Sequence, residues 1–292
     1  MFIIKNRKIF VTISAILVSL SIASLFVFGL KLGIDFKGGS FLEIEYTTER
    51  PAQDVVEESI KVLEIGEIIV QPMGETGYSI KSRDISEEER ASVMTVLGED
   101  AIEKSFTSIG PSVGAELVRK SIISFILVVL GIIFWIAFSF RKVSKPVSSW
   151  KYGFIAVMAL IHDVIIPIGI FTVVSYYHGF EVDTLFVVAI LTILALSVSD
   201  TIVVFDRIRE NIRIKSSKDF TETVGQSIKQ VYTRSIATSS TTLIILIALI
   251  IFGPTSTKMF AIMLAAGMFF GTYSSLFLAS PLLVMFKNTQ KN

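Results

Sequence analysis

Six long apolar segments constrain the fold of this chain more than any other feature. Each is long enough to cross the hydrocarbon core of a bilayer, which takes about 20 residues in a helix. The mean hydropathy of +0.68 over 292 residues is typical of a polytopic membrane protein rather than a soluble one. The segments lie at Ile9–Leu30, Leu117–Phe140, Tyr152–Val174, Thr184–Phe205, Val231–Gly253 and Met259–Phe286.

Basic residues predict the orientation of these six spans, because Lys and Arg gather in cytoplasmic connections. They occur before the first span, between the second and third, between the fourth and fifth, and after the last. The short loop Ser175–Asp183 has none. We therefore expect both termini in the cytoplasm and the segment between the first two spans outside.

The first and last spans each carry an additional prediction. The first is longer than the apolar part of a signal peptide and has no obvious small-residue cleavage site, so we expect an uncleaved anchor. The last is long, and Pro281 predicts a tilt or kink before it. The expected division is an N-terminal end with the first helix at 1–30, an external domain at 31–116, a five-helix membrane domain at 117–286 and a cytoplasmic tail at 287–292.

The external segment predicts a small α+β domain. Ser40–Tyr46 alternates apolar and acidic residues, the period of a half-buried strand. Ser86, with Glu89 three residues later, resembles a capping box at the start of a helix. The order β-α-β-β-α-β is that of a ferredoxin-like domain. The remaining elements are expected at Ala52–Leu63, Glu67–Gln71, Tyr78–Lys81, Glu87–Leu97 and Ala101–Ile109.

The same segment is acidic, with 18 Asp and Glu against 8 Lys and Arg between Lys31 and Glu116. This excess indicates either a solvated surface or a docking face for a basic partner. The fold class as a whole is therefore an α-helical polytopic membrane protein, with six transmembrane helices and one external ferredoxin-like domain.

Asp200 lies within the fourth span, where an ionisable side chain is costly and usually functional. Arg234 lies a few residues inside the fifth span and enters from the same side, so we expect the two side chains to meet. Pairing would offset part of the cost of each charge. The pair either holds two helices together permanently, or Asp200 exchanges a proton while Arg234 changes partners.

Further polar residues lie in the third and fifth spans. His162 and Asp163 are near the middle of the third, but adjacent helical residues point about 100° apart and need not share a face. The histidine is either a neutral interior residue or a member of the proton-coupling set. Arg234, Thr238 and Thr241 share one face of the fifth span, where the hydroxyls either bond to their own helix or hold a water chain.

The remaining features of the sequence indicate helix packing and give no sign of a catalytic or metal site. Gly267, Gly271 and Ser275 recur every four positions in the last span, a spacing that lets helices approach closely. The chain has no cysteine and two histidines, which argues against disulfides, thiol catalysis and the usual zinc sites. We find no nucleotide-binding, hydrolase or metalloprotease motif, so we expect no enzyme activity, no cofactor and no metal.

Several motifs resemble a known family. G-I-D-F-K-G-G-S at Gly33–Ser40 resembles the signature after the first helix of the SecD/SecF family, the accessory subunits of the bacterial Sec protein-export machine. H-D-V at His162–Val164 and three longer motifs are similar in order and spacing to the SecF pattern rather than the SecD pattern. The longer motifs are Ser199–Asn211, Arg234–Leu243 and Gly271–Ser275. The motif residues include Gly33, Asp35, Gly38, Gly39, Asp206, Arg207 and Glu210.

The resemblance implies a half-transporter of the RND superfamily in the bacterial plasma membrane. Such a protein pairs with SecD and uses the proton motive force to assist late export through the SecYEG channel. YajC and YidC are further candidate partners, the translocating polypeptide is the cargo, and nucleic acid is not a partner. By position, Asp200 matches the proton-carrying carboxylate of the family and Arg234 matches its functional arginine.

The chain departs from the family pattern near Asp200, where Leu196 replaces a polar aromatic residue and Ser199 replaces an amide. Two alternative functions therefore stay open. One is an RND half-transporter for a lipid or small hydrophobic molecule, although the external segment is short for that class. The other is a translocase scaffold without proton coupling, for which Asp200→Asn would be tolerated.

Overall fold

The structure is a computed structural model that describes residues 2–140, 147–214, 217 and 219–287. It divides into two compact units. One unit is Leu32–Ile123, and the other contains the chain before and after it.

Among the residues that the structure describes, six helices are long and apolar enough to cross a membrane, as the sequence predicts. Their polar ends continue beyond the apolar segments, because backbone hydrogen bonds propagate a helix past the part that lipid covers. The fourth helix, for example, runs to Arg213 rather than Phe205, and the fifth begins at Phe220 rather than Val231. The helices are α2 (Arg7–Phe28), α6 (Pro111–Phe140), α7 (Ser149–His178), α8 (Thr184–Arg213), α9 (Phe220–Phe252) and α10 (Thr255–Tyr273), with a short α1 (Phe2–Lys5) in front.

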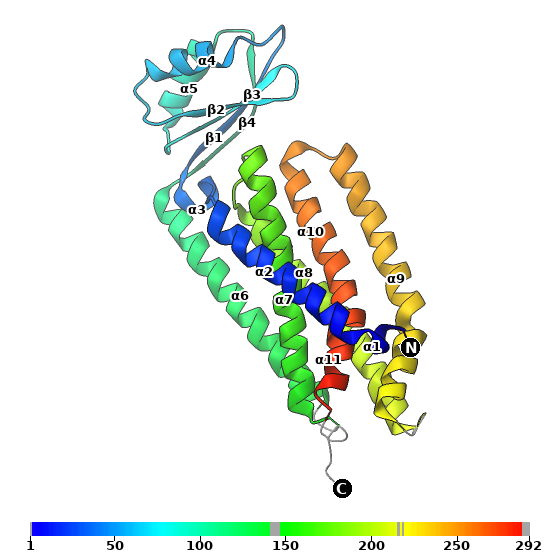
Figure 1. Cartoon of the computed structure of the whole chain (residues 1–292). Coiled ribbons are helices and arrows are strands. Elements are labelled where there is room, and N and C mark those ends of the chain that lie inside the picture. The colour runs from blue at the N-terminus through cyan, green and yellow to red at the C-terminus, as the bar shows by residue number, and fades with distance from the viewer. Residues whose placement is uncertain (1, 141–146, 215–216, 218, 288–292) are drawn as a thin grey trace. The chain divides into compact units, whose positions relative to one another are not determined.

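Helix α10 is the centre of the helical unit, where it packs against α7, α8 and α9 (Figure 1). Helix α2 packs along α7. The spans differ in how much of their apolar part is buried by the rest of the chain. In α7 this share is 61%, whereas in α6 none of the apolar part is buried. The uncovered surface of α6 is therefore left for lipid or another protein.

The predicted irregularity before Pro281 is a π-helical segment, η1 (Ser274–Ala279), followed by α11 (Ser280–Met285). The Ser280 hydroxyl donates a hydrogen bond of 2.9 Å to the Ser275 carbonyl, five residues earlier. Pro281 has no N–H to continue the α-helical ladder. Single π-helical turns are rare and frequently occur at functional sites.

The other unit is a four-stranded antiparallel sheet with the order β2-β3-β1-β4, and α4 and α5 cover one of its faces (Figure 1). This confirms the ferredoxin-like prediction. Alternate residues of β1, Leu42, Ile44 and Tyr46, are buried in its core, as the alternating sequence predicts. The elements are α3 (Ile34–Lys37), β1 (Gly39–Tyr46), α4 (Gln53–Lys61), β2 (Ile69–Met73), β3 (Gly77–Ser82), α5 (Glu87–Leu97) and β4 (Ala101–Ile109).

Strand β2 begins two residues later than predicted and includes Pro72. A proline cannot donate to a sheet ladder, which favours ending the strand before it. The strand lies at the edge of the sheet, however, where one side of the backbone needs no partner. The position of β2 in the sheet order, which the local sequence does not give, therefore explains the difference.

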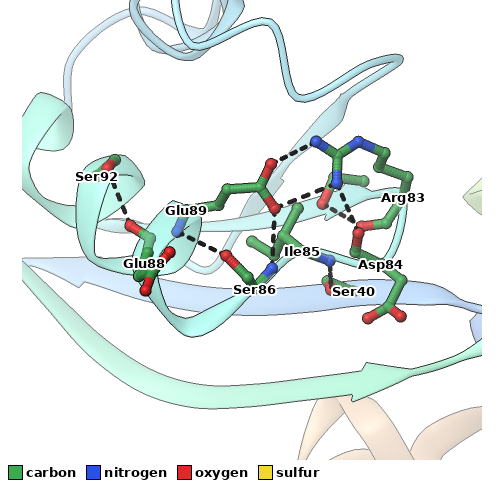
Figure 2. Close-up of polar contacts among 9 residues, drawn as sticks. Ser40, Arg83, Asp84, Ile85, Ser86, Glu88, Glu89 and Ser92 are labelled. Atoms are coloured by element: carbon green, nitrogen blue, oxygen red, sulfur yellow. Dashed lines mark hydrogen bonds and ion pairs between the residues drawn. The ribbon is translucent and has the colours of Figure 1, made fainter.

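The predicted capping box at the start of α5 is present (Figure 2). Ser86 Oγ accepts from the Glu89 N–H at 3.2 Å, and Glu89 Oε2 accepts from the Ser86 N–H at 2.9 Å. Glu89 also forms an ion pair with Arg83, and this contact, followed by the Ser86 N–H, lowers the pKa of the Glu89 carboxyl. Ser40 Oγ accepts from the Ile85 N–H at 3.0 Å, which ties the start of α5 to β1.

Candidate functional site

Asp200 of α8 is half-buried and faces α10. Its Oδ2 accepts a hydrogen bond of 3.1 Å from the Thr272 hydroxyl. Thr272 is buried and also shares a hydrogen bond with Ser239 of α9. Three helices therefore meet in one chain of side chains, Asp200, Thr272 and Ser239.

Asp163 of α7 is fully buried beside this chain. One oxygen accepts from Ser197 of α8 and, at 2.6 Å, from Ser274 at the start of the π-helical segment. The other lies 2.7 Å from His162 Nδ1. Charge-assisted hydrogen bonds of this kind compensate a carboxylate for the loss of water.

The two carboxylates are connected through α10. Thr272 contacts Asp200 and Ser274 contacts Asp163, so both contacts come from one short stretch where α10 passes into η1. Ser197 contributes from α8, three residues before Asp200. We call Asp163, Asp200 and the hydroxyls of Ser197, Thr272 and Ser274 the carboxylate cluster.

His162 adjoins the cluster, because its Nδ1 contacts Asp163 although adjacent helical residues need not share a face. The ring of Tyr273 stacks on the imidazole at 6.1 Å between centroids. Nε2 of His162 is buried and has no hydrogen-bond partner among the described residues. The Tyr273 hydroxyl in turn donates to the Phe10 carbonyl of α2 at 3.1 Å.

Arg234 does not contact Asp200 in this structure, contrary to the sequence-based expectation. Helices α8 and α9 do pack together. The face of α9 that meets α10, however, carries Ser235 and Ser239, and Arg234 points to the uncovered side. Within the part of the chain that the structure describes, Arg234 forms no ion pair.

Thr238 and Thr241 lie on the same uncovered side of α9. Their hydroxyls donate to the carbonyls of Arg234 and Ala237, each at 2.9 Å. Both hydroxyls therefore bond to their own helix, which is the simpler of the two alternatives for these residues. The hydroxyl of Ser239, by contrast, is buried and contacts α10.

The stripe of small residues on α10 faces α8. A Cβ at Gly267 would lie 2.3 Å from Ile193 Cγ1, so only glycine fits there without a shift. Ser275 Oγ lies 3.0 Å from Thr201 Oγ1 of α8. At Gly271 a Cβ would lie 3.5 Å from Ser197 Cα, an ordinary contact. Close packing at Gly267 brings α10 near enough for Thr272 to reach Asp200.

Asp206, Arg207 and Glu210 lie beyond the cluster, at the end of α8. Arg207 forms an ion pair with Glu210 and donates to Gln230 Oε1 of α9 at 2.7 Å. Asp206 lies 3.6 Å from Arg209. The bond from Arg207 to Gln230 joins α8 to α9, and the two ion pairs lie within α8.

The glycine motif lies at the start of the ferredoxin-like unit. Gly33 caps α3, which contains Asp35 in its first turn. Gly38 and Gly39 have φ angles of +80° and +138°, which strain any residue with a side chain. A Cβ would also lie 2.9 Å from Pro111 Cα at Gly38 and 2.6 Å from the Ser82 carbonyl oxygen at Gly39. The two glycines allow the chain to enter β1 in contact with the start of α6.

The sequence reasoning missed four hydroxyl residues that complete the site, Ser197, Ser239, Thr272 and Ser274. One feature of the sequence could have identified them. These hydroxyl residues lie within apolar spans, on the helix faces that also carry the carboxylates and the small residues. Across the described residues, no group of three or more His, Cys, Asp or Glu could hold a metal ion. The arrangement is suited to holding and moving protons through carboxylates and hydroxyls.

Comparison with known proteins finds matches over most of the chain. A family model described as "Protein export membrane protein SecD/SecF, C-terminal" matches residues 89–289, and one described as "SecD/SecF GG Motif" matches residues 23–49. The protein translocase subunit SecF of Thermobaculum terrenum is 39% identical over 302 residues, covering 98% of this chain and 94% of the relative. The SecF subunit of Anaerolinea thermophila is 35% identical, with the same coverage of 98% and 94%.

A solved structure of a related protein is also similar to this chain. The crystal structure of SecDF from Thermus thermophilus, described as a translocon-associated membrane protein, has a TM-score of 0.81 and 28% sequence identity to this chain. The match covers 98% of this chain and 38% of the SecDF chain. Together with the family models, these similarities show that this multi-pass membrane protein belongs to the SecD/SecF family of protein-export membrane proteins.

Proposed function

We propose that this chain, together with SecD, is a proton-coupled accessory subunit of the Sec translocase that assists late steps of protein export. The relatives named as SecF subunits and the SecDF structure support the translocase role. We further propose that it lies in the bacterial plasma membrane with both termini in the cytoplasm, and that it catalyses no covalent reaction. SecYEG, YajC, YidC and the translocating polypeptide are the partners to test.

The observation that carries proton coupling is the connection of Asp163 and Asp200 to one short stretch at the junction of α10 and η1. Among the described residues, neither carboxylate contacts a lysine or arginine. A carboxylate inside a membrane protein needs either a partner or a proton. A proton can therefore change the charge of the cluster with no movement of a counter-ion.

Protonation of Asp200 would also change the hydrogen bonds around it. Its oxygen now accepts from Thr272, and a protonated carboxyl would instead offer an O–H of its own. Thr272 would then rearrange with Ser239, which shifts the contacts of α10 with α8 and α9. The adjacent π-helical segment can take up such a shift by changing its hydrogen-bond register.

The available energy is sufficient for a switch of this kind. One proton moving through a potential of 100 mV releases about 2.3 kcal/mol. Since 1.4 kcal/mol is a factor of ten, this biases a two-state equilibrium by roughly fiftyfold. We propose that the bias reaches the external domain and keeps an emerging polypeptide from sliding back.

The position of Arg234 favours a binding partner on the uncovered face of α9. It lies in a span, is exposed in this chain and forms no ion pair with a described residue. Such a charge in a membrane pairs with another protein group or lines a polar path. We therefore propose that Arg234 meets an acidic side chain of SecD.

The test is protein export into inverted membrane vesicles that contain this chain and SecD. Asp200→Asn should abolish the gain in export that the proton motive force provides, while the complex still assembles. Asp206→Asn is the matched control, because Asp206 is an exposed carboxylate on the same helix, and it should keep the gain. Unchanged force-dependent export with Asp200→Asn would favour the scaffold function instead.

A further inference from the structure

A groove separate from the carboxylate cluster lies between α1 and the first part of α9. Its volume is about 610 Å³, and its walls include Phe2, Ile3, Ile228, Lys229 and Tyr232. This volume lies within the range of roughly 300–1,000 Å³ that is common for small-molecule sites. We call it the α1–α9 groove.

The walls of the groove are suited to an acyl chain. Ile228 is buried at the base, whereas Phe2 is 71% exposed and Tyr232 is 42% exposed. Gly225 has no side chain, which leaves the α9 wall open at that point. Gly225, Ile228, Lys229 and Tyr232 recur at the spacing of one helix face.

The rim of the groove is basic. Lys229 is exposed and forms no ion pair with any residue that the structure describes. Lys5 and Lys8 follow directly after the α1 wall and are also exposed. The acidic residue of α9, Glu222, lies seven residues before Lys229 and is not among the residues that line the groove. The rim therefore offers uncompensated positive charge.

The groove also lies where two spans pass from polar to apolar sequence. The apolar part of α9 begins at Val231, two residues after Lys229, and α2 begins at Arg7, just after α1. Lysine side chains at such a boundary reach toward lipid headgroups while their stems stay on apolar surface. The surrounding lipid is therefore the source that best fits both the walls and the rim.

We propose that the α1–α9 groove binds one anionic phospholipid, with an acyl chain against Phe2 and Ile228 and the phosphate at Lys229. The site uses no residue of the carboxylate cluster. Loss of lipid binding and loss of proton coupling are therefore separate results.

The test is native mass spectrometry of the full chain in detergent, with phosphatidylglycerol or phosphatidylcholine added. The unmodified protein should retain one phosphatidylglycerol more strongly than phosphatidylcholine. Lys229→Gln should weaken phosphatidylglycerol retention about fivefold, the effect expected for one basic side chain near an anionic headgroup. Lys258→Gln, at the start of α10, is the matched control and should change nothing.

A second variant tests the shape of the groove. Gly225→Leu should fill it and reduce retention of both lipids, with gel filtration showing that the protein remains monodisperse. Equal retention of the two lipids by the unmodified protein would overturn the proposal, as would equal losses from Lys229→Gln and Lys258→Gln. A photoreactive residue in place of Tyr232 should cross-link to lipid in membranes, and cross-linking to a polypeptide there would also overturn it.

Discussion

Thr272 donates a hydrogen bond of 3.1 Å to Asp200, across the contact between α10 and α8. Two residues later, Ser274 donates one of 2.6 Å to Asp163. Each hydroxyl can donate in this way only while the facing oxygen is an acceptor. The junction of α10 and η1 therefore holds an acceptor oxygen of each carboxylate.

Thr272→Val should destabilise the helical unit. The change removes the donor to the half-buried Asp200 carboxylate, and an unsatisfied polar group of this kind costs about 1–3 kcal/mol. The Ser239 hydroxyl loses its α10 partner but keeps its bond to the Ser235 carbonyl. Thr257→Val is the control, because that exposed hydroxyl bonds only to the Pro254 carbonyl. The measurement is the unfolding temperature of the purified protein in detergent. Equal shifts for the two variants would contradict the assigned role of Thr272.

Asp163→Leu should be more damaging than Asp163→Asn. Leucine leaves the donors on His162 and Ser197 without an acceptor and leaves the Ser274 hydroxyl only its bond to the Gly271 carbonyl, a loss of about 3 kcal/mol or more. Asparagine keeps one acceptor oxygen and nearly the same shape. The yield of folded protein and its unfolding temperature measure the difference. Similar stability of the two variants would show that these three hydrogen bonds contribute little.

Gly39→Ala should destabilise the ferredoxin-like unit more than Gly74→Ala. Both glycines have positive φ, so alanine is strained at either position by about 1–2 kcal/mol. A Cβ at Gly39 would also lie 2.6 Å from the Ser82 carbonyl oxygen, whereas at Gly74 it would meet nothing within 4 Å. Hydrogen exchange of β1 amides measures the difference. Equal protection in both variants would mean that the chain avoids the clash at little cost.

Glu89 should make the protection of α5 depend on pH. Its pKa is lowered by Arg83 and by the Ser86 N–H from an ordinary value of 4.5. A carboxyl with a lowered folded-state pKa stabilises the fold above its unfolded pKa and loses this effect as the pH falls through the folded value. Protection of α5 amides should therefore be higher in the unmodified protein than in Glu89→Gln near neutral pH, with the difference shrinking below pH 4.5.

The control for this prediction is Glu88→Gln, on the adjacent residue. Among the described residues, the Glu88 carboxylate forms no ion pair. Protection of the α5 amides in Glu88→Gln should equal that in the unmodified protein at every pH. A difference between Glu89→Gln and the unmodified protein that persists undiminished in acid would contradict the linkage.

The sequence predicts the elements of this protein well because their signals are local. The length of the apolar segments identifies the six spans, and the alternation of apolar and acidic residues identifies β1. The capping box of Ser86 and Glu89 marks the start of α5. The limits of β2 depend on its edge position in the sheet, a property of the whole fold. The ends of α8 and α9 continue beyond their apolar cores, because backbone hydrogen bonds propagate a helix past the part that lipid covers.

The candidate site is harder to predict, because helix rotation decides which side chains meet. Asp200 and Arg234 lie on helices that do pack, yet Arg234 faces outward and Ser239 faces α10. Spacing along one helix gives relative directions but no absolute rotation against its neighbours. The hydroxyls of Thr272 and Ser274 gain a role only once α10 lies between α7 and α8.

The most direct test of proton coupling is infrared difference spectroscopy of the reconstituted complex with SecD across a change of pH. The unmodified complex should show a protonated-carboxyl band that appears and disappears with pH, together with changes in helix amide bands. The band should be absent from Asp200→Asn and unchanged in Asp206→Asn. An Asp200→Asn complex that keeps the full titrating band would show that Asp200 is not the group that takes up the proton.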